Sequence, residues 1–156
     1  MKRSSGPFLE KYIEPYWLEG KCGFKVIKYY DKSRPIPCIY DSYIILSGYS
    51  AAFKKNGKWG ILSHKNEMLC EFIFDRIEIK EYCSKKCLAM KGCYWGLINV
   101  DDGSTVIGFK YDFARTLLIE TISSAEIIGD IWGGSLSRSK YYNSYWLLYS
   151  NSKVYI

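Results

Sequence analysis

The stretch KKNGKWGILSHKNEMLCEFIFDRI, from Lys54 to Ile77, decides the fold of this chain. Two short apolar segments flank Asn56-Gly57, the strongest two-residue signal for a β-hairpin, because both central residues of such a turn take positive φ. A second turn signal, Lys65-Asn66, separates residues 58–63 from a longer apolar run. That run ends in DRIEIK, residues 75–80, whose alternation indicates a half-buried antiparallel strand. The stretch therefore predicts a hairpin followed by a third strand.

The same order of residues occurs four times. In MKGCYWGLINVDDGSTVIGFKYDF, residues 90–113, Trp95-Gly96 aligns with Trp59-Gly60. In EGKCGFKVIKYYDKSRPIPCIYDSY, residues 19–43, Cys22 takes the place of the tryptophan. In KYYNSYWLLYSNSKVYI, residues 140–156, Trp146 takes that place, which puts Asn143-Ser144 at the first turn. The last step is longer than the others and predicts an insertion of about 15 residues.

These residues carry a family resemblance. GKWGIL followed by FIFDRI, and YWGLIN followed by FKYDF, resemble WG repeats, also called KWG repeats, over residues 15–120 and 138–156. The resemblance implies an all-β fold, an antiparallel β-meander of four WG-type hairpin repeats in a rolled or propeller-like sheet of about ten to twelve strands. We expect one domain, 1–156, with units at about 15–45, 50–80, 86–120 and 138–156 and a short inserted segment at about 114–139. The family is mainly bacterial and its members are mostly uncharacterised, so the resemblance implies an architecture more firmly than an activity.

We expect the repeated residues to have structural roles. We expect the four tryptophan-equivalent positions to be largely buried between units, since a single unit cannot bury its apolar face alone. Gly60 would let a neighbouring backbone come close or relieve a β-bulge. Asp41, Asp75 and Asp112 are expected to accept hydrogen bonds from backbone N–H groups at turns or strand ends rather than to form a ring of carboxylates.

The composition places few limits on function. The net charge of +6 favours an acidic partner without singling one out. No apolar run reaches the roughly 18 residues of a membrane helix, and charged residues interrupt the N-terminal segment, so we expect a cytoplasmic protein without a membrane partner.

The side chains that usually carry catalysis are sparse. His64 is the single histidine and lies in the turn segment SHKNE, where we expect it to be exposed and without a catalytic role. The spacing of Cys83, Cys87 and Cys93 is not a usual zinc pattern, so no metal and no cofactor is expected, and the six cysteines should be mostly buried as small hydrophobic residues. The sequence therefore predicts a protein that is not an enzyme.

The expected function is protein binding in a bacterial cytoplasm, most specifically as an immunity protein that neutralises a toxin domain with an acidic face. The insertion breaks the period, and it is predicted either to supply an interface or to cap the open end of the sheet. It contains a short segment around Ser124 that could be a helix or a strand. The predicted partner-binding residues are Trp132, Ile128, Ile131, Arg138, Lys55 and Lys58, because Trp and Arg are enriched in interface hot spots. The alternatives are a glycan- or cell-wall-binding module and a nucleic-acid-binding β protein. Nucleic acid is not the expected partner, because acidic residues are interspersed among the lysines.

Overall fold

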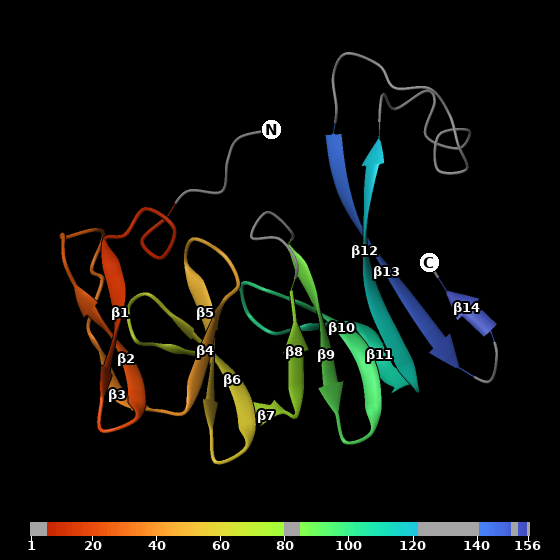
Figure 1. The fold of residues 1–156 in the computed structure, drawn as a ribbon, viewed down its shortest axis with the longest axis horizontal. Coiled ribbons are helices and arrows are strands. Elements are labelled where there is room, and N and C mark those ends of the chain that lie inside the picture. Colours follow the sequence, from red (N-terminus) through yellow and green to blue (C-terminus); the bar gives the residue numbers. More distant parts are fainter. Residues whose placement is uncertain (1–5, 80–84, 122–140, 151–152, 156) are drawn as a thin grey trace.

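The computed structural model describes residues 6–79, 85–121, 141–150 and 153–155, and describes side chains for residues 6–79, 85–112 and 114. These residues form fourteen strands, and none of the described segments is a helix that could cross a membrane (Figure 1). Segment 8–12, which precedes the first strand, consists of turns. The prediction of an all-β antiparallel meander is confirmed.

The strands form four antiparallel sheets that follow one another along the chain. The first contains β1 (Ile13–Leu18), β2 (Lys21–Val26) and β3 (Ile36–Tyr40). The second contains β4 (Ser42–Ile45), β5 (Ser50–Lys55), β6 (Lys58–Ser63) and β7 (Met68–Phe74). The third contains β8 (Arg76–Glu78), β9 (Lys86–Lys91), β10 (Tyr94–Asn99) and β11 (Thr105–Tyr111), and the fourth β12 (Phe113–Thr121), β13 (Tyr141–Ser150) and β14 (Lys153–Tyr155).

In the first three units, the chain leaves one sheet and enters the next at an aspartate. Asp41 separates β3 from β4, Asp75 separates β7 from β8, and Asp112 separates β11 from β12. The strand before the aspartate pairs with its own hairpin, and the strand after it pairs with the following hairpin. The long third strand expected from the sequence is therefore divided between two sheets, which is why there are more strands than the predicted ten to twelve.

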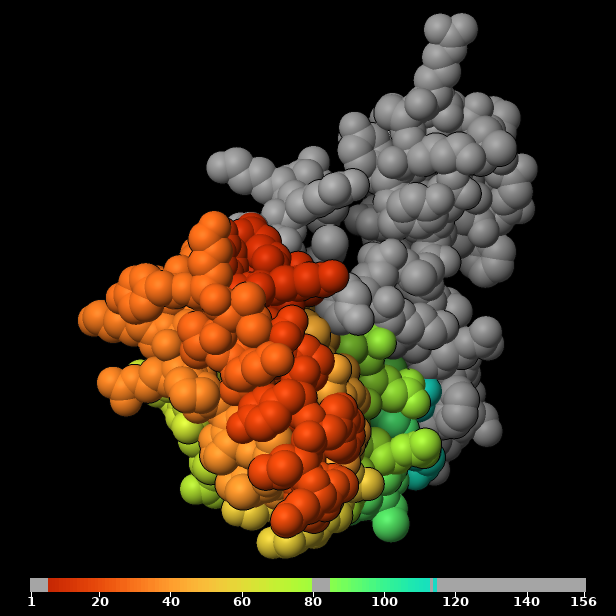
Figure 2. All heavy atoms as spheres, turned by 60° about the vertical axis from the view of Figure 1, so that its left-hand side comes forward, coloured from red at the N-terminus to blue at the C-terminus, as the bar shows by residue number. Residues whose placement is uncertain are grey.

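The sheets lie in an open row and bury their faces against one another (Figure 1). Phe24 of the first sheet packs on Phe53 of the second, with ring centroids 5.7 Å apart. Phe74 of the second sheet packs on Phe109 of the third, with centroids 5.8 Å apart. The second sheet thus has apolar residues on both faces, as stacked repeats require. Figure 2 turns the first sheet, at one end of the row, to the front.

The glycine of each WG-type dipeptide lies under a β-bulge. Trp59 pairs with Phe74 and Ile61 pairs with Cys70, so three residues of the third strand lie opposite the single residue Gly60. The same irregularity lies opposite Gly23 and Gly96. A Cβ atom on Gly96 would lie 2.6 Å from the carbonyl oxygen of Ile107, closer than real Cβ contacts come. The crossing strand therefore leaves no room for a side chain, and the expectation of a bulge and a close backbone approach at Gly60 is confirmed.

The fourth copy was aligned wrongly from the sequence. The residue pairs that close the hairpins are Leu18–Lys21, Lys55–Lys58, Lys91–Tyr94 and Ser150–Lys153. The residues that follow them are Cys22, Trp59, Trp95 and Val154, so Val154 and not Trp146 occupies the tryptophan position. Asn143-Ser144 lies inside β13 and forms no turn. The error arose because turn-forming residues can lie within a strand whose pairing is set by a distant partner.

Burial at the tryptophan positions also differs from the expectation. Cys22 and Trp95 are buried, but Trp59 is only half-buried. The amine of Lys54 lies 6.0 Å from the centre of the Trp59 ring, within the range of a cation–π contact. Trp59 is therefore a partly exposed part of the scaffold.

We predict that Gly96→Ala destabilises the fold by about 1–3 kcal/mol, the usual cost of overpacking. The added methyl group would meet the backbone of Ile107 and the ring of Phe109. Gly108→Ala, on the paired strand, is the matched control, because a Cβ there has no atom within 4 Å, and it should change stability by less than about 0.5 kcal/mol. Urea unfolding measures both, and equal stabilities would contradict the steric role of the glycine.

Candidate functional site

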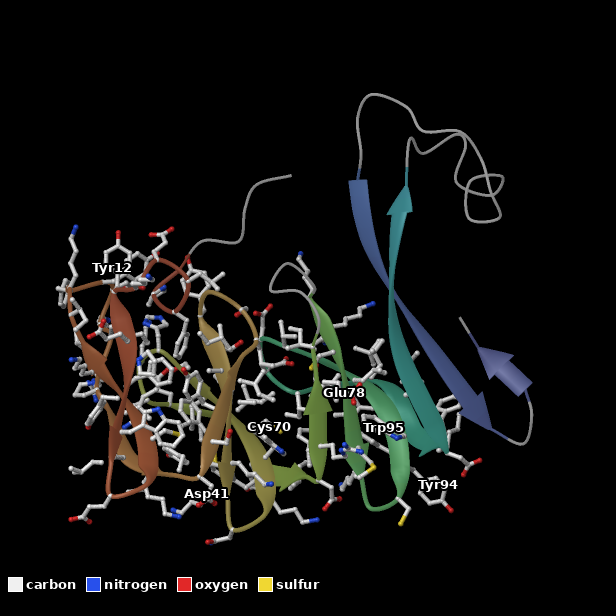
Figure 3. The ribbon with its side chains drawn as sticks, viewed as in Figure 1. Tyr12, Asp41, Cys70, Glu78, Tyr94 and Trp95 are labelled. Carbon is white, nitrogen blue, oxygen red and sulfur yellow. The ribbon has the colours of Figure 1, made fainter. Side chains whose placement is uncertain are left out.

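The opposite ends of the strands form two edges of the row, which we call the turn edge and the loop edge. The turn edge carries the tight hairpin turns, including Asn56-Gly57 and Gly92, together with the aspartates that join the sheets. The loop edge carries the connections at the other ends of the strands, such as residues 27–35, 46–49 and 64–67. Figure 3 shows Asp41 and Tyr94 at the turn edge and Tyr12 at the loop edge.

At the turn edge, each of the first two aspartates ties two units together. The Asp75 carboxylate pairs with the Lys58 ammonium of its own unit, and it accepts a hydrogen bond from the backbone N–H of Gly92 in the next hairpin at 2.8 Å. The N–H of Asp75 donates to the carbonyl oxygen of Met90 at 2.8 Å. The Lys58 hydrogen bond, helped by the Gly92 N–H, holds the pKa of Asp75 below its ordinary value, against the effect of desolvation.

Asp41 repeats this arrangement one unit earlier. Its carboxylate pairs with the Lys21 ammonium, its N–H donates to the carbonyl oxygen of Lys54 at 2.8 Å, and its pKa is lowered first by Lys21 and also by the backbone of Asn56. The expectation that these aspartates bind backbone N–H groups is confirmed for Asp41 and Asp75. In the third unit Tyr94 takes the place of the lysine, so Asp112 lacks this ion pair.

The two lysines predicted to bind a partner both lie on the turn edge. Lys58 is exposed but already paired with Asp75, and Lys55 is half-buried beside it. Together with Asn56 and Phe72 they line a shallow hollow of about 310 Å³. The ion pair serves the scaffold and reduces the positive charge that Lys58 offers to a partner.

At the loop edge, His64 is buried, contrary to the prediction of an exposed turn histidine. Its side chain is 5% exposed, and its ring lies between Tyr30 and Tyr49, with ring centroids 6.1 and 5.8 Å away. Its Nδ1 atom lies 2.9 Å from the Oγ of Ser33. Burial, with a contribution from Lys65, lowers the pKa of His64 and favours the neutral ring.

Tyr30 and Tyr49 flank His64, Tyr12 packs on Tyr30, and Tyr29 precedes Tyr30 in the chain; we call these four residues the tyrosine patch. The hydroxyls of Tyr30 and Tyr49 are 3.1 Å apart, and this hydrogen bond, with desolvation, raises the pKa of Tyr30 to about 12. The ring of Tyr12 lies 5.0 Å from that of Tyr30. Tyr29 is 76% exposed and Tyr49 is 45% exposed, so the patch is open to solvent on one side.

Next to the tyrosine patch lies a pocket of about 400 Å³, within the range that proteins use for small ligands. Its walls come from the second sheet and from the β10–β11 turn, and its lining includes Tyr49, His64, Glu67, Leu69 and Asp101. Ser50, which also lines it, donates a hydrogen bond to the carbonyl oxygen of Val100 at 2.6 Å and so joins the second and third sheets. The pocket therefore lies where two units meet.

The two carboxylates of the β10–β11 turn, Asp101 and Asp102, have different roles. Asp102 accepts a hydrogen bond from the backbone N–H of Ser104 at 2.8 Å, which stabilises the turn and lowers the pKa of Asp102. Asp101 lines the pocket instead.

The predicted insertion joins the ends of β12 and β13 at Thr121 and Tyr141, which correspond to the loop-edge ends of β4 and β5. It lies in the connection between β12 and β13, which corresponds to the β4–β5 connection at residues 46–49, and β12 pairs with β13 from Phe113–Tyr149 to Thr121–Tyr141. This hairpin has nine residues in its first strand, whereas β4 has four, so it extends about 16 Å further at the usual rise of a strand. The predicted interface residues Ile128, Ile131, Trp132 and Arg138 lie outside the described residues.

The cysteines vary in burial. Burial raises the pKa of Cys87 to about 12 and also raises that of Cys22, which makes both thiols poor nucleophiles. Cys38 and Cys70 are half-buried and Cys93 is exposed, while Cys83 lies outside the described residues. Within the described part of the chain, no three metal-binding side chains come together.

Sequence reasoning missed the pocket and the burial of His64. A signal was present in the repeat itself, since His64 occupies the position of Val100 in the next unit, five residues after the tryptophan. Val100 is apolar and fully buried, so the alignment of units indicated an inward-facing position.

We predict that Asp75→Asn lowers the Tm at pH 7, because the neutral amide cannot form the ion pair with Lys58. The lowered pKa of Asp75 contributes stability above its ordinary value of 3.8, and this contribution is lost as the pH falls through the folded-state value. The difference in Tm between the two proteins should therefore shrink between about pH 5 and pH 2. Thermal melts across that range measure this difference, and Asp112→Asn is the matched control. An equal loss of Tm in that control at pH 7 would contradict the stabilising role of the Lys58–Asp75 ion pair.

The comparisons with known proteins agree with this geometry. The family described as WG containing repeat matches residues 95–117, which run from Trp95 through β11 and Asp112 into β12. No curated protein and no solved structure matches the chain. The matched segment spans one passage between sheets, and the same passage occurs at Asp41 and Asp75. Over residues 95–117 the chain is therefore similar to the family of WG-containing repeats.

Proposed function

We propose that this chain is a non-enzymatic protein-binding protein that contacts its partner through the loop edge. The observation that carries the proposal is the distribution of exposed apolar side chains. Five of the nine exposed large hydrophobic side chains in the described part of the chain lie in or next to the loop-edge connections: Ile27, Tyr29, Tyr49, Met68 and Val106. The other four, Trp17, Leu18, Ile39 and Tyr94, lie on strands β1, β3 and β10. Tyrosine and methionine are enriched in protein interfaces relative to the rest of the surface.

The residues of the repeat motif are engaged in structural contacts, which supports placing the partner-binding surface elsewhere. The glycines make room for bulges, the aspartates of the first two units bind lysines and turn N–H groups, and the tryptophan-position residues pack in or beside the core. The loop edge carries the larger differences between units, namely His64 with the tyrosine patch and the long β12–β13 hairpin. Features that a scaffold does not need are the best candidates for contact with a partner.

The specific form that we propose is an immunity protein of a bacterial cytoplasm, which neutralises a toxin domain by covering its surface. The net charge of +6 would attract a domain with an acidic face and speed the encounter. The loop edge, with the tyrosine patch and the β12–β13 hairpin, would then provide the close contacts. Lys55 and Lys58, on the turn edge, would contribute to this attraction and not to the contact surface.

The test is a comparison of the two edges. The genes beside that of this chain are searched for a toxin domain, which is expressed together with the chain, and growth of the cells and the Kd of the purified pair are measured. Replacing Tyr29 and Tyr49 by alanine should weaken binding by about 2 kcal/mol or more, as expected for hot-spot aromatics. The matched variant Lys55→Ala, Lys58→Ala should change the Kd far less and should mainly slow association.

Two outcomes would contradict the proposal. Binding that is lost in the lysine variant and kept in the tyrosine variant would place the interface on the turn edge. Growth that is inhibited equally with and without the chain would exclude the immunity function.

A further inference from the structure

We propose that the 400 Å³ loop-edge pocket receives one basic side chain, arginine or lysine, from the partner protein. This inference rests on the proposed function and specifies the chemistry of the contact. It runs against the overall charge of the chain, since a net charge of +6 would by itself predict an acidic contact.

The charged groups of the pocket favour a cation. Glu67 and Asp101 bring two carboxylates from different sheets, and neither forms an ion pair within the described part of the chain. The one cation in the lining, Lys65, has its amine 3.8 Å from the carboxylate of Asp31, which lies outside the pocket. Lys65 is thus directed toward another partner, and the lining carries one more negative than positive group.

His64 provides an independent observation. Its side chain is 95% buried, since only 5% is exposed, and its Nδ1 atom is occupied by Ser33. The Nε2 atom has no hydrogen-bond partner among the residues that the structure describes. A buried polar atom without a partner is costly. The contact between Nδ1 and the Ser33 hydroxyl fits either tautomer of the neutral ring, and we take the one in which Nδ1–H donates to Ser33 and Nε2 is an acceptor. An N–H group of a guanidinium or ammonium ion would satisfy it.

The remaining walls fit the rest of such a side chain. The ring of Tyr49, held by its contacts with Tyr30 and His64, offers a face for a cation–π contact. Leu69 gives apolar surface for the methylene groups. The hydroxyl of Ser63 accepts the N–H groups of Lys65 and Glu67 at 3.2 and 3.3 Å, which fixes the turn that carries Glu67. Arginine in particular combines several donors with a planar group that stacks on aromatic rings.

The experiment titrates the full-length chain with N-acetyl-arginine amide and follows the His64 and Tyr49 ring signals by NMR. Binding in the millimolar range is expected, with shifts confined to the loop edge. The neutral analogue N-acetyl-citrulline amide and the acidic N-acetyl-glutamate amide should bind at least tenfold more weakly. Equal binding of the neutral or acidic compound would overturn the proposal, as would shifts on the turn edge alone.

Variants separate the pocket from the rest of the surface. The double variant Glu67→Gln, Asp101→Asn should weaken binding of the arginine probe at least tenfold, and Glu78→Gln, an exposed glutamate outside the pocket, should change it less than twofold. The amide spectrum of each variant shows whether it is folded, and Asp101→Asn alone, at an exposed turn position, serves if the double variant is not. If the arginine probe binds with the same affinity to the pocket variants, the inference fails.

Measuring the binding of the partner protein to these variants distinguishes failure of this inference from failure of the proposed function. A partner that binds the double variant as well as the wild type would show that it uses the loop edge without the pocket, which overturns the inference and leaves the proposed function intact. Loss of partner binding in the Tyr29→Ala, Tyr49→Ala variant together with at least tenfold weaker binding in the double variant would support both.

Discussion

The close crossing of the third strand over the motif glycine is the constraint on which the structure depends. At Gly23, Gly60 and Gly96 a bulge of three residues passes so near the second strand that a Cβ atom would overlap it. Bulges bend a strand and increase its twist. The bend directs the chain out of its own sheet, so that the segment after the aspartate can pair with the next hairpin. Without the bulge, the third strand would continue in the same sheet and the units would not be linked by shared strands.

This sharing of strands explains why lysine and aspartate accompany the glycine in the first two units. The aspartate stands where the chain leaves one sheet and enters the next, a place where ladder hydrogen bonds are interrupted. Its carboxylate and its N–H compensate by bonding to both neighbouring hairpins. The exposed ion pair by itself contributes little, so the main effect of the aspartate is to fix the relative position of two units. The third unit, with Tyr94 in place of the lysine, does without that ion pair.

The repeated glycines and aspartates hold the units together by these contacts. The residues at the two edges of the row can therefore differ from one another without loss of the fold. The turn edge repeats its tight turns in the first three units, and the first two of these units also repeat the lysine–aspartate ion pair. The loop edge varies, because its connections are not part of the motif, and here the chain has a buried histidine, a patch of tyrosines and a long hairpin. Loops on a rigid scaffold are the usual place for binding residues. The pocket at this edge forms only because the β10–β11 turn of one unit packs against the β6–β7 region of another.

The sequence by itself determined the repeat, the hairpin turns of the first three units, the strand type and the glycine bulge, because each depends on local backbone preference or on a pattern within one unit. Only the tertiary structure decided the rest. Val154 rather than Trp146 fills the last motif position, since strand register depends on a partner far along the chain. His64 is buried by tyrosines from two other connections, and Asp101 lines the same pocket as Glu67 although the two lie in connections of different sheets. Such contacts join residues that are distant in sequence, and no local pattern specifies their distance.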